Sequence, residues 1–233
     1  MLWKDDFGSV PANTRKECPY LKGHKFLKDM KKSVDDGEYA VVSRMQDAGN
    51  WFAAMDGTDH TGDADGGFLV INISKSYKDK MIYEQELGFT TCENTSYYFS
   101  LWASSISKRV ANGDKTGVLC NLTLEIVNAE NNEVLASIET GDMPNAESID
   151  GEIPWKNYGV SFVSTGEKVK LRIYDHAGNG DKGNDLALDD ISLIACDVTA
   201  PNVELAVDGK DDVSGLCGVD EYTLKVGDLK GWN

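Results

Sequence analysis

The residues best suited to chemistry in this sequence are aspartates gathered just before an apolar stretch. Asp56, Asp59, Asp63 and Asp65 fall within ten residues, directly ahead of the apolar segment 68–74. Carboxylates this close repel one another unless a cation lies among them. Ca²⁺ suits such a cluster because it takes several carboxylate and carbonyl oxygens at once. The cluster therefore predicts a structural calcium ion, with Asp59, Asp63 and Asp65 among its ligands.

The spacing of these aspartates does not match an EF-hand loop. Thr61 stands where a second acidic ligand would be needed, and no glutamate follows at the closing position. Further ligands must therefore come from elsewhere in the chain. A second polar segment offers them, and its members are Asn179, Asp181, Asn184, Asp185, Asp189 and Asp190.

Asp189 and Asp190 are adjacent within an apolar stretch that has the character of a strand. Adjacent residues of a regular strand point to opposite faces, so one of these two carboxylates shares the face of core residues. A buried carboxylate is costly unless it is paired or bound to a metal. We therefore expect Asp189 or Asp190 to be a metal ligand. The alternative is that the inward aspartate caps backbone amides or meets an arginine.

Binding of a sugar would require an exposed aromatic ring with amide or carboxylate partners nearby, because a pyranose has an apolar C–H face and a polar rim. The aromatic candidates are Trp51, Trp102, Trp155 and Tyr158. Each could instead be a core residue. Trp102 lies on the opposite strand face from Phe99 and Leu101, which makes it a surface aromatic or part of a second apolar layer.

The sequence carries no familiar catalytic motif. His24, His60 and His176 occur in no H-E-x-x-H arrangement, and there is no G-x-S-x-G elbow or phosphate-binding glycine loop. We predict that the chain is not an enzyme, and that His60 orients its loop by hydrogen bonding. A sandwich glycosidase or lyase stays open as an alternative, because two carboxylates on a concave face leave no motif in a sequence.

The elements that must position these residues are strands. Alternation of apolar and polar residues with a period of two recurs along the chain. It predicts nine strands, near 38–43, 69–73, 81–88, 96–103, 118–126, 134–138, 160–162, 169–173 and 186–194, with Cys120 pointing inward. Only 22–32 looks helix-like. Many short antiparallel strands over this length predict an all-β jelly-roll sandwich of two antiparallel sheets.

A domain boundary is expected where Pro201 interrupts pairing after Cys196. Residues 1–196 would form the jelly-roll binding domain. Residues 197–233 would be a linker with part of an immunoglobulin-like module, or a short C-terminal β extension. The five cysteines allow one or two disulfides of unknown connectivity and leave at least one thiol unpaired.

Composition narrows the range of partners. A hydrophobic content of 41% is ordinary for a globular protein. A net charge of −16 repels nucleic acid and anionic membrane surfaces. No apolar run is long enough to span a membrane, and the first 30 residues lack the apolar stretch of a signal peptide. We expect neither nucleic-acid binding nor membrane insertion.

An ordered series of motifs resembles jelly-roll modules of large Bacteroidetes surface proteins and, more distantly, MAM domains of animal adhesion receptors. The resemblance covers about residues 3–196. It is carried by Asp5-Asp6-Phe7-Gly8, Trp51, Asp59-His60-Thr61, Cys92 with 95–100, Trp155, and the segment 183–191 followed by Cys196.

This resemblance implies a cation-stabilised sandwich of the carbohydrate-binding-module type. It implies metal ligands from the first and last strands, which here are Asp5 or Asp6 and Asp189 or Asp190. It also implies an extracellular or cell-surface location, attached to the outer membrane, within a longer multidomain chain. We therefore predict a non-catalytic module that binds a glycan or a host or cell-surface protein. The alternative is a MAM-like protein-adhesion or spacer domain.

Overall fold

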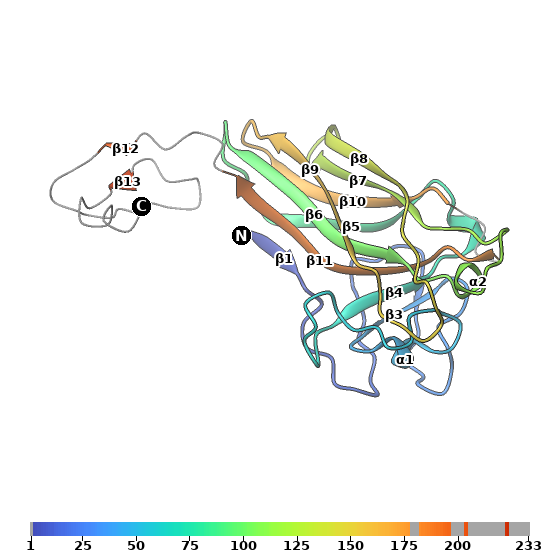
Figure 1. Ribbon diagram of the computed structural model, residues 1–233. Helices are drawn as coiled ribbons and strands as arrows, with labels where there is room; N and C mark the ends of the chain where they lie inside the picture. The colour runs from blue at the N-terminus through green and yellow to red at the C-terminus, as the bar shows by residue number, and fades with distance from the viewer. Residues whose placement is uncertain (1, 178–181, 197–202, 205–221, 224–233) are drawn as a thin grey trace, which may run out of the picture.

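The computed structural model describes residues 2–177, 182–196, 203–204 and 222–223. Two β-sheets pack face to face in the main body (Figure 1). The first sheet contains β1 (Trp3–Asp5), β2 (Lys25–Phe26), β3 (Glu38–Val42), β4 (Phe68–Asn72), β6 (Ser96–Ser105), β9 (Lys156–Val163) and β11 (Asp185–Cys196). The second contains β5 (Lys80–Thr90), β7 (Asn121–Asn128), β8 (Val134–Asp142) and β10 (Lys168–Asp175).

The larger sheet has the order β2-β3-β4-β11-β6-β9, with β1 pairing beside β11, and the smaller has the order β5-β10-β7-β8. All pairings in these sheets are antiparallel except the short β2–β3 pair. This all-β architecture is the predicted jelly-roll sandwich. All nine predicted strands are present. The segment 22–32 holds the short strand β2 instead of a helix.

The main core lies between the two sheets and follows from the alternation of the strands. On β7, Leu122, Leu124 and Ile126 are fully buried, and on the neighbouring strand β10 Leu171 and Ile173 lie directly beside them and point into the same core. Burial of these rows removes apolar surface from water, which is the main force holding the sheets together. Cys120, just before β7, is fully buried as the alternation predicts.

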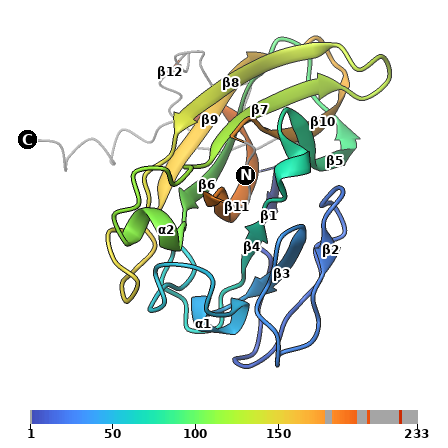
Figure 2. The same cartoon turned by 90° about the vertical axis from the view of Figure 1, so that its right-hand side faces the viewer.

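A second apolar cluster covers the outer face of the larger sheet. Phe68, Val70 and Ala187 point to this side and pack with Phe52 from the segment between β3 and β4. All five residues of β4 are therefore buried, although alternation alone would expose every second one. This segment includes α1 (Met45–Ala48), which lies beneath β3 and β4 in Figure 2.

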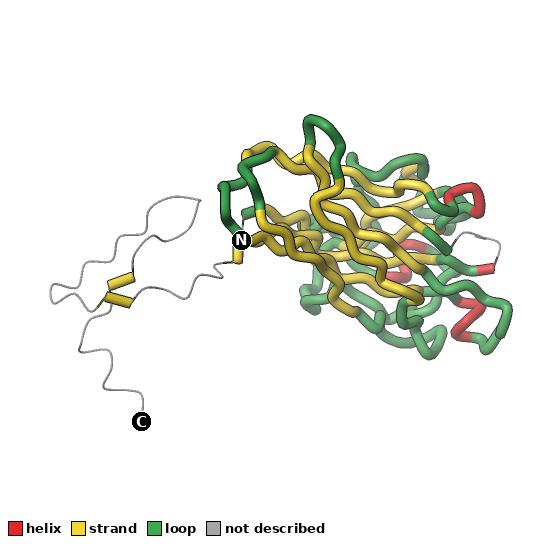
Figure 3. The backbone as a smooth tube through the Cα atoms, turned by 90° about the horizontal axis from the view of Figure 1, so that it is seen from above, coloured by secondary structure: helices red, strands yellow, loops and turns green. Residues whose placement is uncertain are grey.

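The short helices gather at one end of the sandwich. The 3₁₀ turn η1 (Lys75–Tyr77) and α2 (Lys108–Ala111) lie at the end far from the N-terminus (Figure 3). β12 (Val203–Glu204) pairs in parallel with β13 (Tyr222–Thr223). The rest of the predicted C-terminal unit, and Asn179 and Asp181, lie outside the described residues. Cys92 is disulfide-bonded, whereas Cys18, Cys120 and Cys196 are free thiols. None of the described helices is long and apolar enough to cross a membrane.

Candidate ligand and cation sites

An irregularity in β11 brings Asp189 and Asp190 to the same place. β11 pairs with β4 through Asp185–Leu188 and with β1 from Ile191 onward, so the two aspartates lie where one partner replaces the other. The pairing with β6 shifts register at this point, and Asp190 has a positive φ of 47°. Such a bulge redirects side chains. The expectation that the two carboxylates point to opposite faces is therefore wrong for this strand.

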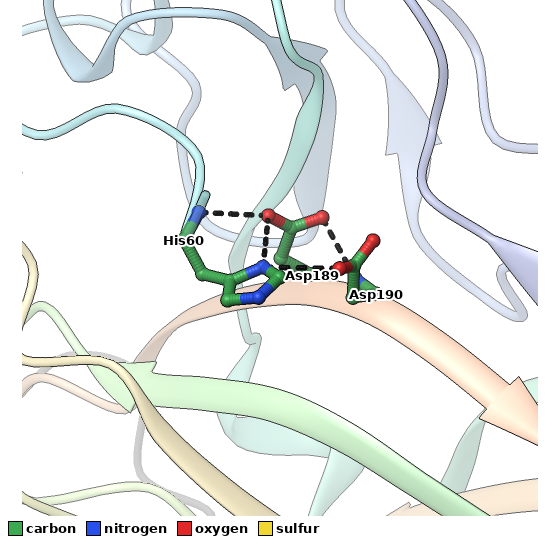
Figure 4. Close-up of side chains that lie close together, drawn as sticks. All are labelled: His60, Asp189 and Asp190. Atoms are coloured by element: carbon green, nitrogen blue, oxygen red, sulfur yellow. Dashed lines mark hydrogen bonds and ion pairs between the residues drawn. The ribbon is translucent and has the colours of Figure 1, made fainter. Parts of the chain in front are cut away.

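Both carboxylates meet the imidazole of His60 (Figure 4). Nδ1 of His60 lies 3.3 Å from Oδ2 of Asp189 and 3.2 Å from Oδ2 of Asp190. Asp189 also accepts two backbone N–H bonds, from His60 at 2.9 Å and from Asp190 at 2.7 Å. The backbone caps foreseen as the alternative role for the inward aspartate are thus present.

A lysine of the first strand completes this cluster. Nζ of Lys4 lies 2.7 Å from Oδ1 of Asp190. Burial raises the pKa of Asp189 to about 6, against the opposing effect of the amide bond from His60. Two carboxylates therefore face one lysine ammonium and one imidazole. We call Lys4, His60, Asp189 and Asp190 the bulge cluster.

The bulge cluster has a mixed donor set that is a poor match for calcium. His60 offers nitrogen, Lys4 already occupies one oxygen of Asp190, and both oxygens of Asp189 accept N–H bonds. Ca²⁺ prefers six to eight oxygens. The three groups His60, Asp189 and Asp190 do present ligand atoms within 4.8 Å of one another. Such a set resembles nitrogen- and oxygen-ligated metal sites more than calcium sites.

The N-terminal aspartates lie outside the bulge cluster. Asp5 pairs with Ile191, and because strand faces alternate it points to the side opposite Lys4. There burial raises its pKa, and Oδ1 accepts the N–H of Phe7 at 3.1 Å. Asp6 is exposed and accepts the N–H of Gly8 at 3.0 Å. The residue of the first strand that reaches Asp190 is therefore Lys4, which the sequence reasoning missed.

The loop before β4 contains the other predicted metal ligands. Asp59 is 8% exposed; its Oδ2 accepts from Oγ1 of Thr61 at 2.5 Å, whereas its Oδ1 is buried without a hydrogen-bond partner. Asp63 is exposed, and exposed Asp65 accepts from Oγ of Ser9 at 2.5 Å. A Cβ added at Gly66 would lie 2.5 Å from Oδ2 of Asp59, so the carboxylate packs directly on the backbone.

Among the residues that the structure describes, the largest exposed aromatic ring borders a groove at the α2 end of the sandwich. Trp51 is 56% exposed. The groove has a volume of about 510 Å³ and opens to solvent. Its lining combines this indole with polar side chains from four separate segments, namely Asp35, Asp36, Asn72, Lys108, Arg109, Asn112 and Asp185. We call it the Trp51 groove.

The other predicted aromatics do not lie in this groove. Trp102 is half-buried and stacks on His60, with ring centroids 4.6 Å apart and planes 17° apart. Trp155 packs edge-on against Phe68, donates its Nε1–H to the carbonyl of Thr58 at 3.1 Å, and lines a pocket of about 240 Å³ beside Asp59. Tyr158 is buried in the core between the sheets.

Comparisons with known proteins give only distant structural likenesses. No protein-family model and no curated protein matches the sequence. Among solved structures, a cyclase from Fischerella sp. TAU aligns with a TM-score of 0.44 at 12% identity, over 67% of this chain and 73% of that one.

Two further solved structures also align distantly with this chain. The sugar-binding C-terminal domain of EclA aligns with a TM-score of 0.38 at 14% identity, over 57% of this chain and 80% of that one. A structure described as "CBM4 structure and function" aligns with a TM-score of 0.37 at 12% identity, over 72% of this chain and 92% of that one. The resemblance to Bacteroidetes and MAM modules stays a prediction.

Proposed function

We propose that this chain is a non-catalytic, extracellular carbohydrate-binding module and that the Trp51 groove is its glycan site. The observation that carries the proposal is an indole 56% exposed at the edge of an open, polar-lined groove. The exposed indole leaves a large apolar ring in water, so a ligand that covers this ring gains free energy. The C–H face of a pyranose is a suitable cover for it.

The polar lining of the Trp51 groove supplies the hydrogen bonds that a sugar rim requires. Asn72 and Asn112 offer amides, and Asp35 and Asp36 offer carboxylate acceptors for hydroxyl groups. Lys108 is held in place by a bond of 2.7 Å from Nζ to the carbonyl of Asn50, next to Trp51. A groove that is open at its mouth accepts part of a longer chain, so the proposed ligand is a polysaccharide.

The surface of the described residues favours a glycan over a protein partner. Besides Trp51, its large exposed apolar side chains are Met30, Val134 and Val163. A protein-adhesion surface is expected to have a contiguous apolar centre. A glycosidase or lyase would need paired carboxylates in a cleft, and Asp36 and Asp185 do line this groove. The binding experiment below therefore also measures the release of sugar products.

We also propose that a structural calcium ion binds at the Asp59 loop instead of the bulge cluster. Oδ1 of Asp59 is a buried carboxylate oxygen without a partner, which is costly in an apoprotein. Ca²⁺ lies about 2.3–2.6 Å from its ligand oxygens. Thr61, Asp63 and backbone carbonyls of the same loop are the oxygen donors nearest in sequence.

The proposed function is tested by a binding screen of insoluble and soluble polysaccharides with the full chain. Retention on at least one polysaccharide, with no release of reducing ends or unsaturated products, supports it. Absence of binding to all polysaccharides and to a glycan array would contradict glycan binding. Release of sugars would contradict the non-catalytic part and point to Asp36 and Asp185 as the acid pair.

A further inference from the structure

The floor of the Trp51 groove contains an unusual pair of buried polar residues. Asn72, the last residue of β4, and Asp185, the first residue of β11, are direct partners across the sheet. Directly opposed residues point to the same face. Both are 7% exposed, and both line the groove. Two polar side chains thus lie together where the sheet meets solvent.

Asn72 has one side-chain atom that the protein leaves unpartnered. Its Nδ2 donates to the carbonyl of Val34 at 3.5 Å, whereas its Oδ1 is buried with no hydrogen-bond partner. The bond to Val34 fixes which way the amide points and leaves Oδ1 without a donor from the protein. An amide oxygen buried without a donor costs free energy, so a ligand that approaches it is favoured.

Asp36 adds a second carboxylate to this place. The N–H of Gly37, the next residue, donates to the carbonyl of Asn72 at 2.8 Å, so the chain at Asp36 runs directly beside the end of β4. Burial raises the pKa of Asp185 well above its usual value, and the negative charge of Asp36 raises it further. Each carboxylate therefore disfavours the charge of the other, and a divalent cation bound between them would relieve this repulsion.

We propose that the floor of the Trp51 groove is a divalent-cation site of the calcium type, with oxygen ligands from Asp185, Asn72 and Asp36. All three ligands are hard oxygens, which match Ca²⁺ and offer nothing to a soft metal. The three protein ligands fill only part of a shell of six to eight oxygens. The free positions face the groove, where water or vicinal hydroxyl groups of a sugar would complete the shell. Completion of the shell by a sugar rests on the proposed glycan-binding function.

A proton is the competing way to neutralise Asp185. A protonated Asp185 could donate to Oδ1 of Asn72 and satisfy both groups without a metal. The two possibilities differ in their pH dependence. A cation site binds more tightly as pH rises, since the metal must displace the proton. A carboxylic acid hydrogen-bonded to Asn72 leaves no cation affinity at neutral pH.

Terbium luminescence tests the cation site without any glycan. Tb³⁺ replaces Ca²⁺ at oxygen sites and emits when a nearby indole transfers energy to it. We expect saturable emission when the full chain is titrated with Tb³⁺. The variant Trp51→Phe should lose the part of this emission that Trp51 excites. Asp185→Asn and Asp36→Asn should each weaken this Trp51-dependent binding at least about tenfold, and excess Ca²⁺ should compete for it.

Controls separate this site from the Asp59 loop and from misfolding. Asp59→Asn should leave the Trp51-dependent emission unchanged, because Asp59 lies next to Trp155 in a different pocket. Asp36 is exposed, so Asp36→Asn tests the site even if Asp185→Asn fails to fold. Equal emission from wild type, Trp51→Phe and Asp36→Asn would overturn the proposal, as would affinity that does not rise between pH 5 and pH 8.

The bridging role is measured with a polysaccharide that the binding screen retains. We expect chelation to weaken its binding at least about tenfold and Ca²⁺ to restore it. Glycan binding that survives chelation, together with Trp51-dependent terbium emission, would refute the bridge and keep the cation site. If no polysaccharide binds, the proposed function is contradicted. The terbium titration would still show whether a cation binds at the floor of the Trp51 groove.

Discussion

The backbone N–H of His60 donates to Oδ2 of Asp189 over 2.9 Å, although the two residues are 129 positions apart. This bond fastens the loop before β4 to the bulge in β11. Nδ1 of His60 reaches Asp189 and Asp190, and its ring stacks on Trp102, the residue opposite Asp189 on β6. The loop that carries Asp59 is therefore held by charged and aromatic contacts together.

Replacement of Asp189 by asparagine should change how stability depends on pH. Burial raises the pKa of Asp189 from 3.8 to about 6, so its contribution to native stability is full below pH 3.8 and is lost as pH rises through 6. Asparagine does not ionise. The free energy of unfolding of Asp189→Asn relative to wild type should thus rise between pH 4 and pH 7, by on the order of 2–3 kcal/mol.

Urea unfolding in the presence of a chelator, at steps of pH, measures this difference. Asp6→Asn serves as the matched control, since Asp6 is exposed and accepts only the local N–H of Gly8. A difference between Asp189→Asn and wild type that stays constant with pH would show that Asp189 ionises as freely in the folded state as in the unfolded one.

Removal of the Lys4 ammonium should destabilise the bulge cluster. Lys4→Met removes the ion pair of 2.7 Å to Asp190, which is 13% exposed. Because the lysine itself is partly exposed, we expect a loss of about 1–2 kcal/mol at pH 7. Lys4→Arg should lose less. If the double variant Lys4→Met, Asp190→Asn is as unstable as the sum of the single changes, the two residues are not coupled.

Chelation should lower the unfolding temperature if calcium binds the Asp59 loop. At a free calcium concentration 100 times the dissociation constant, the ion adds about 2.7 kcal/mol. Asp59→Asn should lose most of the shift that wild type shows between chelator and Ca²⁺, whereas Asp6→Asn should keep it. A wild-type chain shown to be free of metal, with an unchanged unfolding temperature, would rule out the structural ion.

The sandwich could be predicted from the sequence because burial of alternate residues leaves a direct pattern. Leu122, Leu124 and Ile126 show it on β7. The strand β4 was also found, from the alternation of Leu69, Ile71 and Ile73, although a second apolar cluster buries its other face as well. The helix-like pattern at 22–32 was misleading, because pairing of β2 with β3 outweighs a weak local preference.

The sites were less predictable because they depend on irregular backbone and on distant contacts. Alternation cannot foresee the bulge that turns Asp190 toward His60. Nothing in the sequence marked Lys4 as a partner of Asp190, because a single lysine in a short strand is common. Asn72 and Asp185 become partners only through the order of strands in the sheet. Trp51 was among the aromatic candidates, but its exposure depends on the fold around it.

The central claim is that the exposed indole of Trp51 binds a glycan. Calorimetric titration of the retained polysaccharide into Trp51→Ala tests it most directly, with Trp155→Phe as a control outside the groove. We predict that Trp51→Ala binds at least about tenfold more weakly, a loss of about 1.4 kcal/mol or more, with an unfolding temperature close to that of wild type. Equal affinity of Trp51→Ala and wild type would contradict the account.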